Sequence, residues 1–170
     1  GVARVCLAIQ KNPEKAFDYT YLSRAVAVIT DGSAILGLGN IGPRAGMPVI
    51  EGKAALFASL VGLSGIPILV ESTSIDHFVD IVRSIAPSFG AILLEDISAP
   101  RCFEIEHKLR ARLQMPVLHD DQHATAVVTL AALLNATRIT GTSLDKLVVG
   151  IVGLGAAGLG IARLLRAFGV

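Results

Sequence analysis

The stretch AILLEDISAPRCFEIEHKLRARLQMPVLHDD, residues 91–121, decides the fold of this chain. It begins with the apolar run Ala91–Leu94, continues through the helical pattern Pro100–Leu113 and reaches a second apolar run, Pro116–Leu118. Both runs are continuously apolar rather than alternating, which is typical of strands buried on both faces of a parallel sheet. A strand, a helix and a strand in this order predict a right-handed βαβ unit.

The same kind of alternation extends outward from this stretch. Three further apolar runs predict strands at Ala25–Thr30, Ile66–Val70 and Leu147–Val152. Further helical patterns cover Gly52–Leu63, Ile75–Ile85, Thr125–Ala136 and Leu159–Phe168. Because strands and helices alternate from residue 66 onward, we predict the α/β class, with a parallel sheet flanked by helices.

Composition excludes several classes of protein. The chain has 170 residues, of which 52% are hydrophobic and 17% charged, so it is long and apolar enough for an ordinary folded domain. Its net charge of +1 argues against a partner that is a nucleic acid or a membrane surface. The most apolar stretch, Ala126–Leu134, is too short to cross a bilayer. Cys6 and Cys102 are too few for a disulfide scaffold, so we expect a reduced, cytoplasmic protein.

A glycine motif lies between the last predicted strand and the last predicted helix. It reads Gly153-Leu-Gly155-Ala-Ala-Gly158. In a dinucleotide-binding turn the first glycine permits the tight bend, the second admits the pyrophosphate and the third packs the helix on the strand. The residues that we expect to contact the cofactor at this helix N-terminus are Gly153, Gly155, Ala156, Ala157 and Gly158. A turn whose glycines serve packing alone is the alternative.

The segment Thr137–Lys146, rich in threonine, glycine and serine, is the predicted domain boundary. We expect a first domain over residues 1–140 and the beginning of a dinucleotide-binding domain over residues 141–170. A complete domain of that kind needs a further strand and a residue that reads the ribose, about 20 positions after the glycines. We therefore expect the chain to be a piece of a longer protein.

Another segment has the same glycine spacing, Gly37-Leu-Gly39-Asn-Ile-Gly42. Pro43 and Pro48 follow it closely, and no helical pattern begins directly after the third glycine. We interpret it as a glycine-rich loop of an active site, with a purely structural turn as the alternative.

Two acidic pairs are the strongest chemical signal. Glu95-Asp96 and Asp120-Asp121 each follow a predicted strand of the central stretch. Because the carboxyl ends of neighbouring parallel strands meet at one edge of the sheet, we expect these carboxylates to lie together. Their repulsion favours a hard divalent cation, Mg²⁺ or Mn²⁺, between them. The alternative is a set of solvated acids, with Asp121 capping the next helix.

Three basic side chains accompany the acidic pairs. His119 and His123 flank the second pair with a spacing that could bind zinc, but the HExxH pattern is absent, so we interpret both as orienting or packing groups. Lys53 is predicted at the start of the helix Gly52–Leu63. There the helix dipole and partial burial would lower its pKa, as a general base requires. By spacing alone, a surface lysine is the alternative.

Several stretches together resemble the malic enzymes of the compact prokaryotic type. They are TDGSAILGLGNIGP (30–43), PVIEGKAALF (48–57), LEDI (94–97) with CFEIE (102–106), and HDDQHATA (119–126). The resemblance implies a malic enzyme N-terminal-like domain followed by the first βα turn of a truncated Rossmann domain. It also implies oxidative decarboxylation of L-malate to pyruvate and CO₂, with NAD or NADP and with Mg²⁺ or Mn²⁺.

The resemblance also implies roles for individual residues. It makes Glu95, Asp96 and Asp121 the metal ligands. Lys53 becomes the base that takes the proton of the C2 hydroxyl, with Asp120 beside it to tune or relay that proton. The glycines of the C-terminal motif would hold the cofactor pyrophosphate. The family resemblance further implies a homodimer or a larger homo-oligomer.

The chain departs from the family pattern at some points. The tyrosine that protonates the enol carbon belongs to a stretch that would precede Gly1, and the later substrate-binding asparagines would follow Val170. Ala124 stands where glycine is usual. We therefore expect these residues alone to be inactive. The alternatives are a malolactic or oxaloacetate-decarboxylating relative, and a truncated binding or dimerisation module without catalysis.

Overall fold

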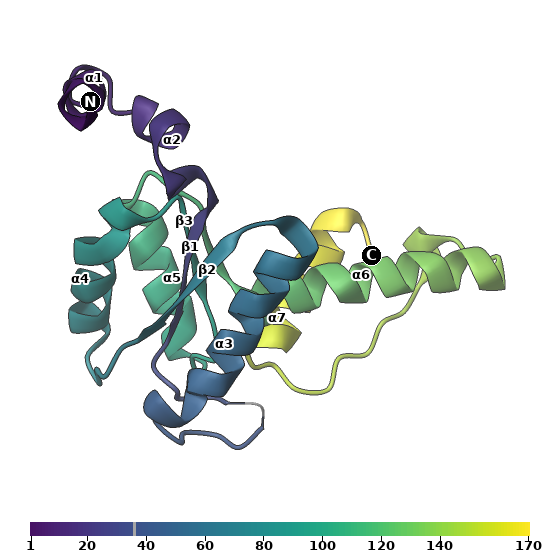
Figure 1. Ribbon diagram of the computed structural model, residues 1–170. Coiled ribbons are helices and arrows are strands. Elements are labelled where there is room, and N and C mark those ends of the chain that lie inside the picture. The colour runs from purple at the N-terminus through teal and green to yellow at the C-terminus, as the bar shows by residue number, and fades with distance from the viewer. Residues whose placement is uncertain (36) are drawn as a thin grey trace.

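The computed structural model describes residues 1–35 and 37–170, and at its centre lies a four-stranded sheet (Figure 1). Its strands are β1 (Ala25–Thr30), β2 (Ser64–Leu69), β3 (Ala91–Leu94) and β4 (Val117–His119). They lie in the order β2-β1-β3-β4, and every neighbouring pair is parallel. The predicted class, α/β with a parallel sheet flanked by helices, is confirmed.

Helices cover the two faces of the sheet (Figure 1). On one face, α4 (Ile75–Ile85) and α5 (Arg101–Arg112) pack against alternate strand residues such as Ile29. On the other face, Ile50 of α3 (Met47–Leu56) packs against the residues between them, such as Val28. Successive side chains of a strand point to opposite faces, so both faces of β1 have to be apolar; its residues are all buried, and Thr30 at its end is polar.

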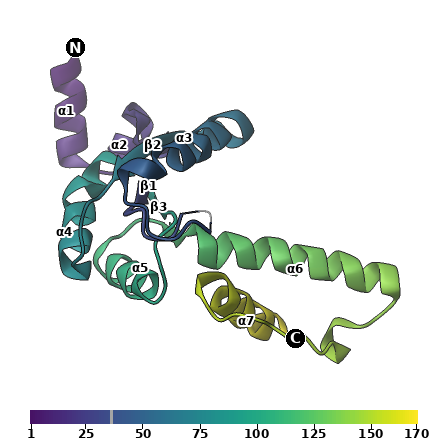
Figure 2. The same ribbon diagram turned by 90° about the horizontal axis from the view of Figure 1, so that it is seen from below.

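The remaining helices extend beyond the sheet. Helices α1 (Val2–Lys11) and α2 (Lys15–Tyr19) contain no buried residue and project from its amino end (Figure 1). Helices α6 (Asp120–Thr140) and α7 (Ala156–Phe168) pack against each other and lead away from it (Figure 2). The short helical segments are η1 (Tyr21–Arg24), η2 (Arg44–Gly46), η3 (Phe57–Val61), η4 (Ala86–Ser88) and η5 (Leu144–Lys146). No helix in the described ranges is long and apolar enough to cross a membrane.

Three helices begin earlier than the sequence pattern indicates, and one of them is α7, which begins at Ala156 rather than Leu159. Helix α3 begins at Met47, with Pro48 in its first turn, where the fixed φ of proline suits a helix start. Lys53 therefore lies in the last turn of α3, and its predicted place at a helix N-terminus is wrong. Helix α6 begins at Asp120, five residues before the predicted start at Thr125, because two carboxylates in a first turn favour the positive end of the helix dipole.

The strand predicted at Leu147–Val152 is wrong, since these residues form no regular structure. A strand needs a neighbour for its backbone N–H and C=O groups, and no strand of the described ranges lies beside this segment. Val148 and Val152 are almost completely exposed as a result. The apolar composition of the run suits a strand, but within the described residues the run pairs with no other strand.

Helix α7 approaches α6 at Gly160, and this contact generates a stability prediction. A Cβ at position 160 would lie 2.2 Å from the carbonyl oxygen of Gln122, and a backbone atom cannot move aside easily. We expect Gly160→Ala to lower the free energy of unfolding by about 1–3 kcal/mol, measured by urea unfolding with circular dichroism.

Gly52 provides the matched control, because it too lies within a helix but a Cβ there meets no atom within 4 Å. Gly52→Ala should raise the free energy of unfolding by roughly 0.5–1 kcal/mol through the loss of unfolded-state entropy. Equal effects of the two substitutions would contradict the close packing of α6 on α7.

Candidate active site

The register of the sheet brings the two acidic pairs together. Leu94 of β3 pairs with Ile29 on one side and with His119 of β4 on the other. The next residues, Glu95 and Asp120, therefore leave the sheet side by side at its carboxyl edge. The backbone N–H of Glu95 still donates to the carbonyl of Ile29 at 2.8 Å, which continues the sheet by one residue.

Three of the carboxylates converge on one point. One carboxylate oxygen from each of Glu95, Asp96 and Asp121 lies within 4.8 Å of the others, and Glu95 and Asp96 are each only 5% exposed. Asp96 adopts a left-handed backbone conformation, with φ of 53°, which turns the chain sharply after β3. The predicted metal ligands thus share one site, where their hard oxygen donors suit Mg²⁺ or Mn²⁺.

Lys53 projects from α3 toward the same site. Its Nζ donates a hydrogen bond to Oδ2 of Asp120 at 2.8 Å and lies 3.2 Å from Oε2 of Glu95. Burial alone would lower the pKa of Lys53, but the hydrogen bond to Asp120 and the charge of Glu95 outweigh it and raise the pKa. The predicted lowering of this pKa is therefore wrong for the free protein, because the sequence pattern does not reveal the two anions that face Lys53.

The carboxylates themselves are destabilised as anions. Burial raises the pKa of Glu95 to about 8, and the charge of Asp120 adds to this effect. Burial also raises the pKa of Asp121, again with a contribution from Asp120. Among the described residues, the buried Oε2 of Glu95 has the ion pair with Lys53 but no hydrogen bond of good geometry. A bound cation would stabilise the charged carboxylates, because it supplies positive charge. It would also give Oε2 of Glu95 a partner.

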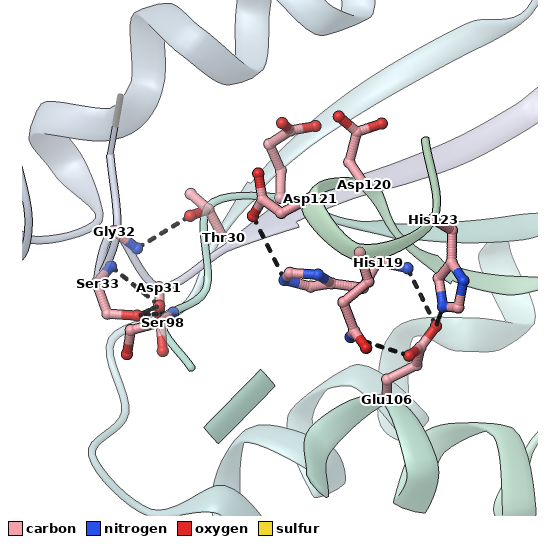
Figure 3. Close-up of polar contacts among 12 residues, drawn as sticks. Thr30, Asp31, Gly32, Ser33, Ser98, Glu106, His119, Asp120, Asp121 and His123 are labelled. Atoms are coloured by element: carbon pink, nitrogen blue, oxygen red, sulfur yellow. Dashed lines mark hydrogen bonds and ion pairs between the residues drawn. The ribbon is translucent and has the colours of Figure 1, made fainter. Parts of the chain in front are cut away.

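The loop that follows β1 lies beside the site (Figure 3), and the backbone N–H of Ala34 donates to the carbonyl of Asp96 at 3.0 Å. The carboxylate of Asp31 accepts from the backbone N–H and hydroxyl of Ser33 and from Nε of Arg101 at 3.0 Å. Ser33 in turn accepts from the backbone N–H of Ser98 at 2.9 Å. These residues line a cavity of about 310 Å³. Asn40 and Gly42 of the predicted glycine-rich loop line it as well. Leu36, which immediately precedes that loop, lies outside the described residues.

The two histidines lie behind the carboxylates. His119 is fully buried, with Nε2 at 3.6 Å from Oδ2 of Asp121, and burial lowers its pKa. Nε2 of His123 lies 2.6 Å from Oε1 of Glu106. Within the described ranges, neither histidine belongs to a group that could hold a metal. His119 faces Asp121 and His123 faces Glu106, and their role as orienting or packing groups stays a prediction.

The C-terminal glycine motif forms a tight turn at the start of α7. Gly153 has a positive φ of 97°, and a Cβ at Gly158 would lie 2.0 Å from the carbonyl oxygen of Gly153. At Gly155, the N-cap of α7, a Cβ meets no described atom within 4 Å, and no side chain caps the helix. Ala156 and Ala157 form the first turn, whose unpaired N–H groups suit an anionic ligand.

The sequence motifs indicate no role for Asp31, Arg101 or Glu106, although each of these charged side chains forms a hydrogen bond or an ion pair close to the site. For Glu106 a signal was present. Cys102, Ile105 and Leu109 are buried at the spacing of one face of α5, and Glu106 falls within that face. A charged residue in an apolar stripe indicates a buried polar contact. Asp31 and Arg101 are 70 residues apart, so no local pattern connects them.

The geometry of Lys53 generates a titration prediction. Asp120→Asn removes the charge and the strong acceptor that hold the ammonium, while burial still disfavours the charged form, so the pKa of Lys53 should fall. The check is a ¹³C NMR titration of the metal-free protein with dimethylated lysines, in which Lys53→Arg identifies the resonance. Glu51→Gln, at an exposed position of the same helix, is the control. An unchanged pKa in Asp120→Asn would contradict the contact.

Comparison with known families and proteins agrees with this site. The profile described as "Malic enzyme, N-terminal domain" matches residues 1–74 and 70–110, and the profile described as "Malic enzyme, NAD binding domain" matches residues 122–169. Over the full chain, 58% of residues are identical to the NAD-dependent malic enzyme 1 of Bacillus subtilis, of which the chain covers 39%. A bifunctional malic/malolactic enzyme of the same organism is 48% identical over the full chain, which covers 42% of it.

Solved structures give the same result. The crystal structure of malic enzyme from Pyrococcus horikoshii superposes with a TM-score of 0.97 and 49% identity, over 100% of this chain and 39% of that one. The chain thus spans about two fifths of the length of these relatives. An NADP-dependent malic enzyme of Escherichia coli is 47% identical over the full chain, which covers 22% of it, so relatives with either cofactor occur. Because the N-terminal profile matches more than half of its residues, the chain belongs to the malic enzyme family.

Proposed function

We propose that this chain carries the substrate and metal half of an enzyme that oxidatively decarboxylates L-malate to pyruvate and CO₂ with reduction of NAD⁺ or NADP⁺. The observation that carries the proposal is the position of Lys53. Its Nζ lies within 3.2 Å of both Asp120 and Glu95, beside the three converging carboxylates. A titratable nitrogen next to a set of hard oxygen ligands is what removal of a proton from a metal-bound hydroxyl requires.

In this proposal, Glu95, Asp96 and Asp121 hold a divalent cation. A cation there would supply a Lewis acid for the C2 oxygen of malate and would cancel the charge of Glu95 that now raises the pKa of Lys53. Lys53 takes the proton of the C2 hydroxyl after it has given up its own. Asp120, hydrogen-bonded to Nζ at 2.8 Å, orients the amine and offers an oxygen that can receive that proton.

The proposed binding site for the cofactor is the glycine turn at the start of α7. Residues 153–158 would hold the pyrophosphate of NAD⁺ or NADP⁺. The cofactor would supply the hydride acceptor, its nicotinamide ring. Gly153 and Gly158 allow the close turn, and Gly155 leaves its outer side open for the phosphates. Which of the two cofactors binds is set by a residue that reads the ribose, and the described residues contain no strand after α7 to carry it.

A second candidate function is the malolactic reaction, in which malate yields lactate and CO₂. The 48% identity to a bifunctional malic/malolactic enzyme favours it. Both reactions use the same base and the same metal ligands, so these residues do not separate them. The products do: pyruvate accumulates with NADH or NADPH in one, and lactate accumulates without net reduction of the cofactor in the other.

The experiment that tests the proposal uses the longest protein that contains this chain, with the 170-residue chain beside it. Malate, Mn²⁺ and either NAD⁺ or NADP⁺ are supplied, and reduced cofactor and organic acids are quantified together. Pyruvate in stoichiometric amounts with reduced cofactor is the expected result for the longer protein. Lactate without reduced cofactor would favour the malolactic reaction, and untouched malate would favour a binding or dimerisation module without catalysis.

Replacement of Lys53 gives a sharper prediction. Lys53→Ala should lower kcat by about 10²–10⁴-fold, since the base is lost, while Mn²⁺ still binds to the carboxylates. The measurement is steady-state kinetics in the longer protein, combined with direct Mn²⁺ binding by electron paramagnetic resonance. Lys108→Ala on α5 is the control, because Lys108 pairs with Asp76 and Glu104, away from the site. An increase in KM for malate alone, with kcat retained, would remove Lys53 from the role of base.

A further inference from the structure

We infer that Glu106 is a positioning residue: from α5 it holds the first turn of α6, and thereby sets where Asp120 and Asp121 stand relative to Glu95. The inference rests on the proposed function, because it concerns the metal ligands named there. The carboxylate of Glu106 accepts from His119, Gln122 and His123, so its effect on Asp120 and Asp121 passes through the backbone of α6.

Glu106 is a buried carboxylate with three partners, all of them from residues 119–123. Its side chain is only 8% exposed. Oε1 accepts from the backbone N–H of His119 at 3.2 Å and from Nε2 of His123 at 2.6 Å. Oε2 accepts from Nε2 of Gln122 at 3.1 Å. Figure 3 shows the carboxylate between the two histidines, on the opposite side of the helix start from Asp120 and Asp121.

The three donor residues flank Asp120 and Asp121 along the chain. His119 precedes Asp120, and Gln122 and His123 follow Asp121. A helix start is often closed by a glutamate at its own third position, which accepts from the backbone N–H of the N-cap residue. In α6 the N-cap is His119, whose side chain makes no capping hydrogen bond. Glu106 makes the equivalent contact from another helix, so α5 determines the position and orientation of the first turn of α6.

The donor pattern explains why a carboxylate occupies this position. Three N–H groups point at one side chain, and a carboxylate accepts all of them because both of its oxygens are acceptors only. A glutamine has the same shape but one of its ends is an NH₂ group, which would face either Gln122 or the pair of donors from His119 and His123. Gln122 can meet that NH₂ group only by turning its own amide over, and the hydrogen bonds from His119 and His123 lose the negative charge that strengthens them, so the first turn of α6 is held less firmly.

The test compares Glu106→Gln with Glu104→Gln in the longest protein that contains this chain. Both substitutions remove one negative charge from α5, but Glu104 is half-exposed and pairs with Lys108 at the surface. Direct Mn²⁺ binding by electron paramagnetic resonance is the main readout, with thermal unfolding measured in parallel. We expect Glu106→Gln to raise the Kd for Mn²⁺ by about 10–100-fold, the loss typical for partners that orient metal ligands. Glu104→Gln should bind Mn²⁺ as the parent does.

Kinetics separate positioning from general stability. If Glu106 positions the ligands, an excess of Mn²⁺ restores most of kcat in Glu106→Gln, because the folded site is present but binds weakly. A change that only lowered the thermal stability would leave the Kd of the folded protein unaltered and would gain nothing specific from added Mn²⁺. An unchanged Kd in folded Glu106→Gln overturns the inference.

Two further variants complete the design. Asp121→Asn should abolish Mn²⁺ binding; if it binds normally, the proposed metal site itself is wrong, whereas loss in Asp121→Asn with none in Glu106→Gln overturns only the role of Glu106. Gln122→Met removes one of the three hydrogen bonds and keeps the volume, which tests the same idea if Glu106→Gln does not fold. We expect it to weaken Mn²⁺ binding several-fold, and a Kd within twofold of the parent value would count against positioning.

Discussion

The contact of Lys53 with Asp120 and Glu95 ties three separate elements of the chain to one point. Lys53 comes from α3, Glu95 follows β3 and Asp120 opens α6. Four carboxylates meet at this edge of the sheet, and Lys53 is the cation that faces two of them. Groups of like charge are costly to bury together, so the arrangement depends on this ammonium in the free protein and, in the proposed enzyme, on a metal ion.

The same contact explains the protonation of Lys53 and Glu95 in the protein without ligands. The pKa of Lys53 is raised, so at neutral pH this side chain holds its proton. The pKa of Glu95 is raised to about 8 by burial, so this group also resists carrying its full negative charge. Both shifts have the sign expected of a site that lacks positive charge. In the proposed mechanism, the binding of a cation is therefore coupled to the release of a proton from Lys53 or its neighbours.

Two polar networks surround this centre and hold its parts in place. On one side, the ion pair of Asp31 with Arg101 connects the end of β1 to the start of α5, and Ser33 extends the connection to Ser98. On the other side, Glu106 connects α5 to the start of α6. Helix α5 thus takes part in both networks. In the proposed enzyme, such surrounding contacts would keep the metal ligands in place, and α5 contributes a residue to both of them.

The sequence by itself determined the strands that form the sheet, the α/β class and the identity of the acidic residues. Buried parallel strands require continuous apolar runs, and such runs are visible at Ala25–Thr30 and Ala91–Leu94. The resemblance of short motifs to the malic enzymes added the family, which the comparisons confirm. The apolar run Leu147–Val152 forms no strand, because such a run becomes a strand only where a neighbouring strand pairs with it.

Only the tertiary structure decided the charge of the site and the roles around it. The pKa of Lys53 depends on Asp120, 67 residues away, and the contacts of Glu106 and Arg101 reach across 13 and 70 residues. Local patterns report which face of a helix is apolar and where a helix can begin. They do not report which side chains meet at a sheet edge, because that depends on strand order and register, and electrostatic effects act over a few ångströms in space rather than along the chain.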